Sequence, residues 1–357
     1  MTILHIAKSM GNLYNGVHVV VPQHIRAQSE YATVACVNLT NVKLCEGIPQ
    51  FDYDKNFNIK NLPSPFNKPD VVIFHECYRF EYLKIAKQLK KNKVPYIILP
   101  HGELSKEAQK KKRLKKIVAN IIFFNRFTRR AAAIQCLSNR ELETTKFGKK
   151  RFIGTNGVDV PEIKKNSFST DELKLLYIGR LDAFHKGLDI LVEAVAKAKQ
   201  TFLQNSVTLD IYGPDYNGRF AHLEDLVKVN GVGEVITLHH EIFGEQKIKK
   251  LLEADVFVQT SRFEGMPLGI LEALSYGIPC LVTDGTTLKN TIDDYNAGWG
   301  AQTNAESVSL AFEKMIAQKD ELIKKSENAV KAVTEKFCWS KIAADAVKSY
   351  EQIVKGK

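Results

Sequence analysis

The sequence lacks the marks of proteins that span membranes, are secreted or depend on cross-links. No apolar run approaches the roughly 18 residues that a membrane helix needs, and the first residues do not have the basic start of a secretory signal. The six cysteines are scattered, with no pair at Cys-x-x-Cys spacing, so neither a zinc site nor a disulfide framework is indicated. We therefore expect a protein of the reducing cytoplasm.

The length and composition indicate a folded protein of two domains. A chain of 357 residues is longer than one hydrophobic core usually serves, which favours two domains of roughly 150 residues each. Hydrophobic residues make up 44% of the chain and charged residues 25%, the balance of a globular protein, so disorder is not expected. No internal repeat or low-complexity tract stands out.

Positive charge gathers in the first half of the chain. Residues 1–160 hold 27 Lys and Arg against 12 Asp and Glu, a net charge of +15, whereas residues 161–357 hold 24 against 28, a net charge of −4. The excess peaks between residues 106 and 130, where a lysine-rich stretch up to Lys116 precedes the apolar run 117–124. This asymmetry predicts an acidic partner for the first domain.

Both halves alternate short strands with helices, the pattern of parallel sheets joined by crossover helices. In the first half, residues 70–74 and 95–99 are continuous apolar runs, as expected for strands buried on both faces, with helical spacing between them at 82–91. In the second half, a strand at 175–178 precedes an amphipathic helix at 187–199. Further strands are predicted at 208–212, 235–238, 256–258 and 280–282, and a last helix at 339–354. The predicted fold class is α/β, with two doubly wound parallel sheets.

The boundary between the domains is expected within residues 155–171, where turn residues are followed by a polar stretch. We accordingly assign residues 1–160 to an N-terminal domain and residues 161–335 to a C-terminal domain. Residues 336–357 form a separate terminal segment.

The sharpest local pattern lies at residues 261–274, after a predicted strand and at the start of a predicted helix. Glycines let a backbone approach a ligand closely, and the free amides of a helix start bind anions, which suits a pyrophosphate. The stretch that supplies them is Gly265, Met266, Pro267, Leu268 and Gly269. Glu264 and Glu272 flank it, and their carboxylates can accept hydrogen bonds from sugar hydroxyls. The alternative is an ordinary strand, loop and helix with a capping glutamate.

Two cations stand in a second stretch of the same type, Arg180 and Lys186, directly after a predicted strand. Ligands of open parallel sheets bind at the carboxyl ends of strands, so these cations are placed to bind an anion there. An Arg fork and a compact Lys charge suit a diphosphate leaving group. The alternative is a pair of solvated cations at a helix start, which the helix dipole disfavours.

Three weaker candidates lie in the first half of the chain. His75 and His101 each follow a predicted strand and can serve as polar contacts or proton acceptors, although a lone histidine is often structural. The loop 12–17 contains Gly16 and can bring backbone amides to the ligand, although any tight turn also uses a glycine.

Taken together and in order, these stretches resemble the retaining nucleotide-sugar glycosyltransferases of family 4, which have the two-domain GT-B fold. The resemblance rests on motifs that cover nearly the whole chain. They are the glycine loop at Gly16, Pro-His-Gly at 100–102, Asn-Gly-Val-Asp at 156–159, Gly-Arg-Leu with Lys186, Glu-x7-Glu from Glu264 to Glu272, and Phe-x-Trp at 337–339.

This resemblance implies two Rossmann-like domains facing a cleft, an N-terminal acceptor domain and a C-terminal donor domain, with the terminal helix crossing back to the first. It implies that Arg180 and Lys186 bind the donor diphosphate, that Glu264 and the 265–269 backbone hold the donor sugar, and that Glu272 binds the ribose. By the same resemblance, His101 lies close to the reacting sugar. His75 stays a candidate on the acceptor side from its position after a strand. We expect a UDP- or GDP-sugar as the donor and no need for a metal or other cofactor.

The first half also resembles bacterial enzymes of capsule, exopolysaccharide or O-antigen assembly, especially at residues 100–104 and in the lysine-rich segment that follows. Those enzymes extend a lipid-pyrophosphate-linked glycan at the inner membrane surface. The basic segment 106–116 is then expected to bind anionic lipid, with the enzyme cytoplasmic and peripheral on the membrane. The alternative is a solvated helix face beside a core helix.

Two rival functions fit parts of these patterns. One is a GT-B epimerase or phosphorylase-like enzyme acting on sugar phosphates, against which the full Glu-x7-Glu with Arg180 and Lys186 argues. The other is a nucleic-acid-binding or inactive nucleotide-sugar-binding protein, whose basic N-terminal domain would be its surface. We favour the transferase, and expect no nucleic-acid partner.

Overall fold

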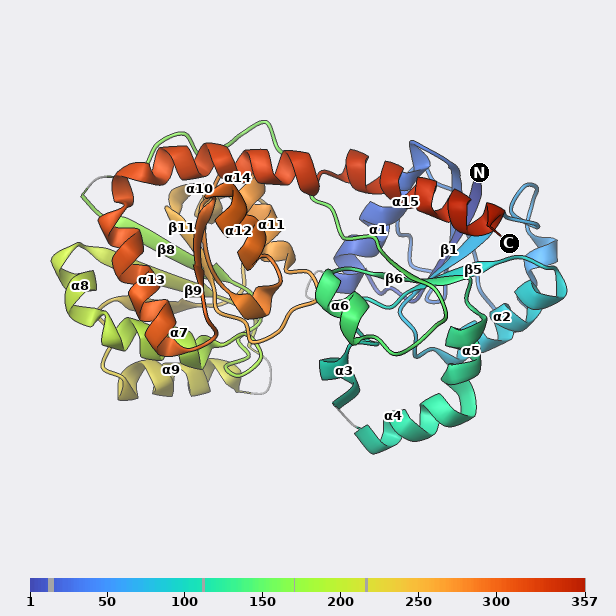
Figure 1. Ribbon diagram of the computed structural model, residues 1–357, viewed down its shortest axis with the longest axis horizontal. Coiled ribbons are helices and arrows are strands. Elements are labelled where there is room, and N and C mark those ends of the chain that lie inside the picture. The colour runs from blue at the N-terminus through green and yellow to red at the C-terminus, as the bar shows by residue number, and fades with distance from the viewer. Residues whose placement is uncertain (12–15, 111–112, 170, 216–217, 357) are drawn as a thin grey trace. The chain divides into compact units, whose positions relative to one another are not determined.

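The computed structural model describes residues 1–11, 16–110, 113–169, 171–215 and 218–356 (Figure 1). It divides into two compact units. The first contains residues 1–157 and 339–357, and the second contains residues 158–338. No helix among the described residues is long and apolar enough to cross a bilayer.

The first unit is built on a parallel sheet of seven strands in the order β3-β2-β1-β4-β5-β6-β7. The strand order reverses between β1 and β4, which are direct neighbours, and open α/β sheets bind ligands at the carboxyl ends of strands beside such a reversal. The strands are β1 (Thr2–Ala7), β2 (Thr33–Asn38), β3 (Gln50–Phe51), β4 (Val71–His75), β5 (Tyr96–Leu99), β6 (Ala133–Cys136) and β7 (Arg151–Ile153).

Helices cover both faces of this sheet. One face, which carries Leu4 and Phe74, packs on α2 and on the aromatic residues Phe124 and Phe127. The last helix, α15, belongs to this unit, where it packs on α1 through a cluster around Trp339. The helices are α1 (Gly16–Ser29), η1 (Ile59–Asn61), α2 (Phe80–Lys91), α3 (Lys106–Lys110), α4 (Arg113–Ala119), η2 (Asn120–Phe124), α5 (Asn125–Arg130), α6 (Asn139–Thr144) and α15 (Trp339–Lys355).

The second unit has a parallel sheet of six strands in the order β10-β9-β8-β11-β12-β13. Its strands are β8 (Leu173–Ile178), β9 (Val207–Tyr212), β10 (Ile236–His239), β11 (Val256–Gln259), β12 (Cys280–Thr283) and β13 (Gly298–Ala301). Along β8, Leu175 and Tyr177 face one core and Leu176 faces the other, as the alternation of a strand requires.

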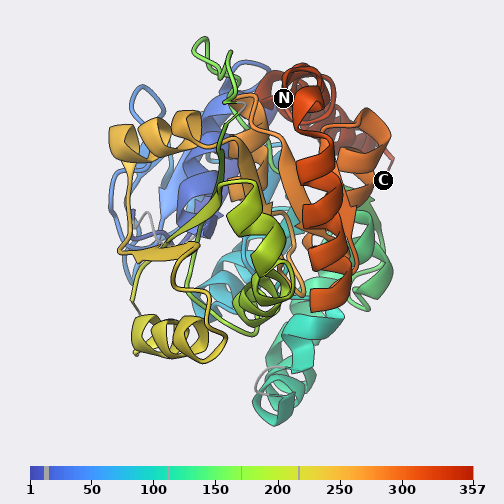
Figure 2. The same ribbon diagram turned by 90° about the vertical axis from the view of Figure 1, so that its left-hand side faces the viewer.

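Two helical layers enclose the second sheet (Figure 2). One core contains residues of α7 (Leu188–Lys197), α8 (Lys199–Gln204), α9 (Arg219–Val229) and α13 (Ala305–Ala317). The opposite core contains residues of α10 (Gly244–Glu253), α11 (Leu268–Ser275), α12 (Lys289–Tyr295) and α14 (Leu322–Lys336). Two short turns, η3 (Asp284–Thr286) and η4 (Lys319–Glu321), complete the unit.

The α/β class and the two doubly wound parallel sheets predicted from sequence are confirmed. Both predicted apolar strands of the first unit are buried along their whole length in β4 and β5. Boundaries move by one or two residues, so that His75 is the last residue of β4 rather than the residue after it.

The helix predicted from Gly187 begins at Leu188. Gly187 is its N-cap in the left-handed region, with φ 64°, and a Cβ there would lie 2.0 Å from the carbonyl oxygen of Thr260. Only glycine therefore lets the turn after β8 lie this close to the residue after β11.

Candidate functional site

The second unit brings Lys186 and Glu264 together in the loops that follow β8 and β11. The Lys186 Nζ lies 2.5 Å from the Glu264 Oε1, and the side chains are only 14% and 12% exposed. The same oxygen accepts hydrogen bonds from the Ser261 hydroxyl at 2.9 Å and the Gln259 amide at 3.3 Å. A buried ion pair needs such additional hydrogen bonds to offset the loss of hydration.

This environment keeps Glu264 ionised. Burial alone would raise the pKa of Glu264, but the charge and hydrogen bond of Lys186, with the hydroxyl of Ser261, outweigh it and hold the pKa below the ordinary value of a glutamate. The site therefore presents a carboxylate and an ammonium side by side.

The Glu264 loop is anchored by the segment that follows β12. The backbone N–H of Glu264 donates to the carbonyl of Gly285 at 2.9 Å, and the hydroxyl of Thr287 donates to the carbonyl of Gly265 at 3.4 Å. A Cβ on Gly285 would lie 2.1 Å from the carbonyl oxygen of Ser261, so a larger residue would displace the loop. Gly285 was not among the predicted residues, because its role depends on a contact between two loops.

The helix predicted after this loop is α11. Pro267 is its N-cap, and the carbonyl of Pro267 accepts the N–H groups of Ile270 at 3.2 Å and Leu271 at 3.3 Å. The N–H groups of Leu268 and Gly269 come before these bonds, in the first turn, where a helix has amides to offer to an anion. Met266 is the half-buried residue just before this N-cap.

Glu272, on α11, forms an ion pair with Lys247 of α10. Both side chains are about a quarter exposed, so a ligand hydroxyl can still reach the carboxylate. Lys247 was not among the predicted residues. It lies 25 residues from Glu272, and no local motif links the two positions.

Arg180 differs from Lys186 although both were predicted as one pair of cations. Its side chain is exposed and forms no ion pair with any residue that the structure describes. Its backbone is held firmly, because the carbonyl of Arg180 accepts the Tyr177 hydroxyl at 2.9 Å and the N–H of Asp182 at 2.8 Å. The structure therefore places the Arg180 guanidinium in the loop after β8, without an ion pair among the described residues.

In the first unit, His75 and His101 lie in a row with a third residue, His5 of β1. The His5 Nδ1 lies 2.9 Å from the His75 Nε2, and the His75 Nδ1 lies 3.1 Å from the His101 Nε2. Successive rings stack with centroids 5.2 and 5.3 Å apart. A fourth histidine, His24 of α1, lies 6.0 and 6.3 Å from the rings of His75 and His101 and hydrogen-bonds to Asn156.

These histidines are neutral at pH 7. Burial lowers the pKa of His5 and His101 to about 3 and that of His24 to about 4, and it lowers the pKa of His75 well below its ordinary value. Each ring therefore has one N–H donor and one bare acceptor nitrogen. His5 and His24 were not predicted, although His5 was visible as a polar residue inside an otherwise apolar strand.

The backbone after β5 aims His101 at this row. His101 has φ 50° and the next residue, Gly102, has φ 85°. A left-handed conformation costs a non-glycine residue roughly 1–2 kcal/mol, so the surrounding contacts must hold His101 in place. The N–H of Gly102 donates to the buried carboxylate of Glu141 at 2.9 Å, which fixes this turn.

The predicted glycine loop is only partly described. Gly16 is the first residue of α1, while residues 12–15 lie outside the described part of the chain.

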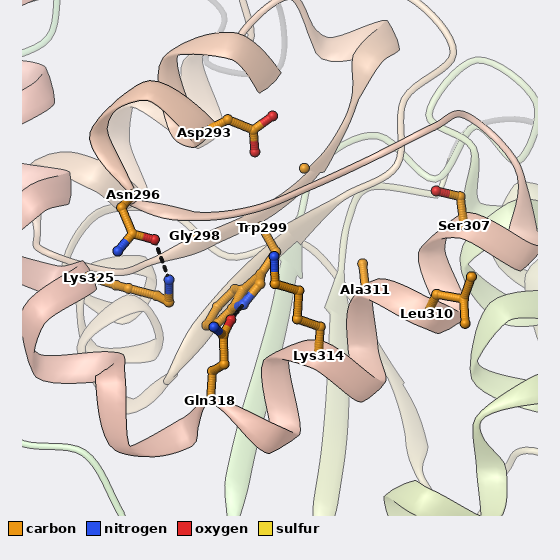
Figure 3. Close-up of a pocket in the computed structure, with 11 residues that line it drawn as sticks. Asp293, Asn296, Gly298, Trp299, Ser307, Leu310, Ala311, Lys314, Gln318 and Lys325 are labelled. Carbon is orange, nitrogen blue, oxygen red and sulfur yellow. Dashed lines mark hydrogen bonds between the residues drawn. The ribbon is translucent and has the colours of Figure 1, made fainter.

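A hollow of about 480 Å³ lies elsewhere in the second unit, against β13 and α13 (Figure 3). None of the predicted site residues lines it. Its buried cation, Lys325, donates to Asn296 at 2.6 Å, pairs with Glu321 at 3.3 Å and lies over the Trp299 ring. Because these partners are internal, we interpret Lys325 as part of the packing of α14.

Comparison with solved structures defines the class of this fold. A sucrose-phosphate synthase from Thermosynechococcus elongatus has a TM-score of 0.77 at 16% identity, with all of both chains covered. Anabaena HepE, solved in complex with UDP and glucose, has a TM-score of 0.72 at 15% identity, with 99% of this chain and 100% of that chain covered. The protein therefore has the two-domain GT-B fold.

Sequence comparison concerns mainly the second unit. The family model described as glycosyl transferases group 1 matches residues 159–335 of the chain. A putative glycosyltransferase, EpsF of Bacillus subtilis, is 30% identical over 38% of this chain and 36% of its own length. A probable sucrose-phosphate synthase of Thermosipho melanesiensis is 24% identical over 82% of this chain and 73% of its own. The chain spans less than half the length of the first curated relatives that it matches.

Proposed function

We propose that this protein is a retaining glycosyltransferase that moves a sugar from a nucleoside-diphosphate sugar to a glycan acceptor. The observation that carries the proposal is the buried Lys186–Glu264 pair, inside the region that matches the group 1 glycosyltransferase model. An epimerase or phosphorylase-like enzyme would also need an anion site, and the full Glu-x7-Glu together with Arg180 and Lys186 is the reason to favour the transferase.

In this proposal Lys186 and Arg180 stabilise the diphosphate as it leaves. Lys186 has three N–H donors and donates one of them to Glu264, so the other two can bind phosphate oxygens. The exposed guanidinium of Arg180 binds further phosphate oxygens. Amides in the first turn of α11 add the favourable end of the helix dipole. These groups supply positive charge where negative charge develops, so the proposed reaction needs no metal ion.

The two glutamates bind hydroxyls in this proposal. Glu264 is ionised and accepts hydrogen bonds from the donor sugar, together with the backbone of residues 265–269. Glu272, which Lys247 holds in place, accepts hydrogen bonds from the ribose. Retention of the anomeric configuration is proposed from the family 4 resemblance, with attack on the face from which the phosphate leaves.

The donor is proposed to be a UDP- or GDP-sugar, and UDP is supported by the complex of the structural neighbour HepE with UDP and glucose. A thermal-shift screen with UDP, GDP and ADP tests this part. A ligand at 100 times its Kd stabilises the folded protein by about 2.7 kcal/mol, so a matching nucleotide raises Tm by several degrees. No shift with any of the three nucleotides would contradict the proposed donor site.

In the first unit, His101 is proposed to contact the reacting sugar as a neutral hydrogen-bonding group. A cell-surface glycan that grows on a lipid pyrophosphate is the proposed acceptor. A role in cell-surface polysaccharide assembly is proposed from the resemblance of the first half of the chain to enzymes of capsule, exopolysaccharide or O-antigen assembly.

A basic and apolar surface on the first unit supports action at the membrane. Leu114, Ile121 and Ile122 are 80%, 70% and 61% exposed, and α4, which carries Arg113 and Lys115, contains no buried residue. Isoleucines beside basic residues bind anionic bilayers by partial insertion plus charge attraction. We therefore propose that the enzyme is cytoplasmic and binds the inner face of the membrane through α4 and η2. A merely solvated helix face would not present these apolar side chains to water.

A further inference from the structure

We propose that a chain of buried side chains from Gln135 to His75 fixes the tautomer of His101, so that its Nε2 carries the proton and its Nδ1 is left as the acceptor. The proposal concerns only the first unit and rests on the proposed function for its consequence in catalysis. His75 is then a positioning residue behind His101. Its two ring nitrogens are engaged by His5 and His101, so it is not available as a contact for the acceptor.

The donor and acceptor of each hydrogen bond in this row can be assigned from its first member, a carbonyl group, which can only accept. The carbonyl oxygen of Gly154 accepts a hydrogen bond at 2.9 Å from Gln135, which identifies the bonded atom as the Gln135 amide nitrogen. The Gln135 oxygen then accepts the hydroxyl proton of Tyr350 at 2.6 Å. With its proton committed, the Tyr350 oxygen can only accept, and it accepts from the Gln28 amide nitrogen at 3.4 Å.

These bonds orient the amide of Gln28, whose oxygen is the atom left for His5. The Gln28 Oε1 and the His5 Nε2 are both buried and have no partner within bonding distance among the described residues. Gln28 lies beside His5 and raises its pKa against the effect of burial. An amide oxygen accepts only from a protonated nitrogen, so these two buried atoms satisfy each other only if His5 carries its proton on Nε2.

The protonated nitrogen of each remaining histidine then follows in turn, because one ring nitrogen of a neutral histidine donates and the other accepts. A neutral His5 with Nε2–H has a bare Nδ1, so His75 must donate to it from Nε2. The His75 Nδ1 is then bare, and His101 must donate to it from Nε2. His101 is therefore left with Nδ1 as a hydrogen-bond acceptor. The opposite direction would present N–H at this position and would leave two acceptors, at Gln28 and His5, facing each other.

This arrangement decides what chemistry His101 offers. A bare Nδ1 can accept a hydroxyl proton, whereas the other tautomer can only donate. Which nitrogen carries the proton is set by the hydrogen bond that the other one makes. In a serine-protease triad, holding the histidine in the wrong tautomer lowers kcat by about 10⁴.

Tyr350→Phe tests the chain far from His101. The substitution removes one hydroxyl and leaves the amide of Gln28 free to turn. We expect the tautomer ratio of His101 to fall about 5-fold, the equivalent of about 1 kcal/mol for one hydrogen bond. The measurement is the ¹⁵N chemical shift of the ring nitrogens in the full-length protein labelled at histidine, with His101 assigned from the spectrum of His101→Asn.

Tyr96→Phe is the matched control. Tyr96 is also buried in the first unit, but its hydroxyl donates to the carbonyl of Phe127 at 2.7 Å, outside the histidine row. This variant should keep the wild-type tautomer. Gln28→Met, which removes the acceptor for His5, should reproduce the effect of Tyr350→Phe and serves if that variant does not fold.

Each readout has a result that overturns the proposal. A wild-type spectrum with the proton on Nδ1 of His101 overturns it, as does an unchanged ratio in both Tyr350→Phe and Gln28→Met. In turnover assays, both variants should lower kcat by the same factor with little change in the donor KM. The NMR result does not depend on activity. A tautomer shift without any transferase activity would therefore refute the proposed function but would still support the proposed row of hydrogen bonds.

Discussion

Both units bury titratable side chains near the carboxyl ends of their parallel strands, but these side chains are ionised in one unit and neutral in the other. In the second unit Glu264 stays charged, because Lys186 supplies a counter-charge at 2.5 Å. In the first unit the histidines have no counter-ion in the part of the chain that the structure describes, so burial lowers their pKa values and they stay neutral. The difference shows that the partner, rather than burial itself, decides whether a buried group is ionised.

The largest effect is expected from breaking the charged pair. Lys186→Ala should lower turnover by about 10²–10³-fold, because it removes a cation from the leaving diphosphate. It should also destabilise the second unit by about 3–5 kcal/mol, because it leaves Glu264 buried without its partner. Steady-state kinetics and thermal unfolding measure the two effects separately.

Lys165→Ala is the control for this variant. Lys165 and Asp255 form a comparably buried pair in the same unit, 3.0 Å apart, away from the predicted site. This variant should lose stability but retain turnover at a temperature where it is folded. Wild-type turnover in Lys186→Ala would remove the basis of the proposed donor site.

Arg180→Ala should separate binding from stability. Arg180 is exposed and unpaired among the described residues, so its loss should leave Tm nearly unchanged. A charged hydrogen bond contributes roughly 1.5–3 kcal/mol, so affinity for the nucleoside diphosphate should fall about 10–100-fold. Calorimetric titration with UDP checks this. A large fall in Tm with unchanged affinity would show that Arg180 is structural.

Acidification should destabilise the first unit before the second. The unfolded chain protonates its histidines below about pH 6.5, whereas folded His5 and His101 take up protons only near pH 3. The free energy of unfolding therefore falls as the pH drops below about 6.5, by about 1.4 kcal/mol per pH unit for each histidine that stays neutral. Glu103 and Glu141 have raised pKa values, so their protonation stabilises the folded first unit as the pH falls. These two groups only partly offset the destabilisation from the four histidines.

Glu264 acts in a lower window. Its folded pKa lies below the unfolded value, so its contribution is complete above about pH 4.5 and is lost only as the pH falls through the folded pKa. The two tryptophans report on the units separately, Trp339 in the first and Trp299 in the second. Between pH 6.5 and 5, fluorescence of Trp299→Phe should show lowered stability while that of Trp339→Phe should not. Equal loss in both would contradict the neutral-histidine assignment.

The smallest effect is expected at the surface of the first unit. Ile121→Ser and Ile122→Ser should each weaken binding to anionic vesicles by about 5-fold, roughly 1 kcal/mol, because each removes apolar surface from the bilayer interface. Val229 of the second unit is also highly exposed, and Val229→Ser should bind like the wild type. Co-sedimentation measures this, and equal binding by all three variants would argue against the proposed membrane surface.

Much of the fold followed from local patterns. The continuous apolar runs at 70–74 and 95–99 predicted buried parallel strands, because only strands covered on both faces need no polar alternation. Glycines and charged residues directly after the strands indicated where a ligand would bind, because the carboxyl ends of parallel strands lie on one edge of a sheet. The pairing of Glu272 with Lys247 could not be predicted, since a helix distant in sequence supplies the cation.

The sequence by itself determined the two parallel sheets, the uneven charge and the position of Lys186 and Glu264 in loops after strands, because these depend on residue type and on spacing along the chain. Only the tertiary structure decided which side chains share a proton or a charge. His5, His75 and His101 are far apart in sequence, and their tautomers depend on contacts that reach Tyr350 in the last helix. Hydrogen-bond direction and ionisation are set by neighbours in space, which spacing along a chain does not specify.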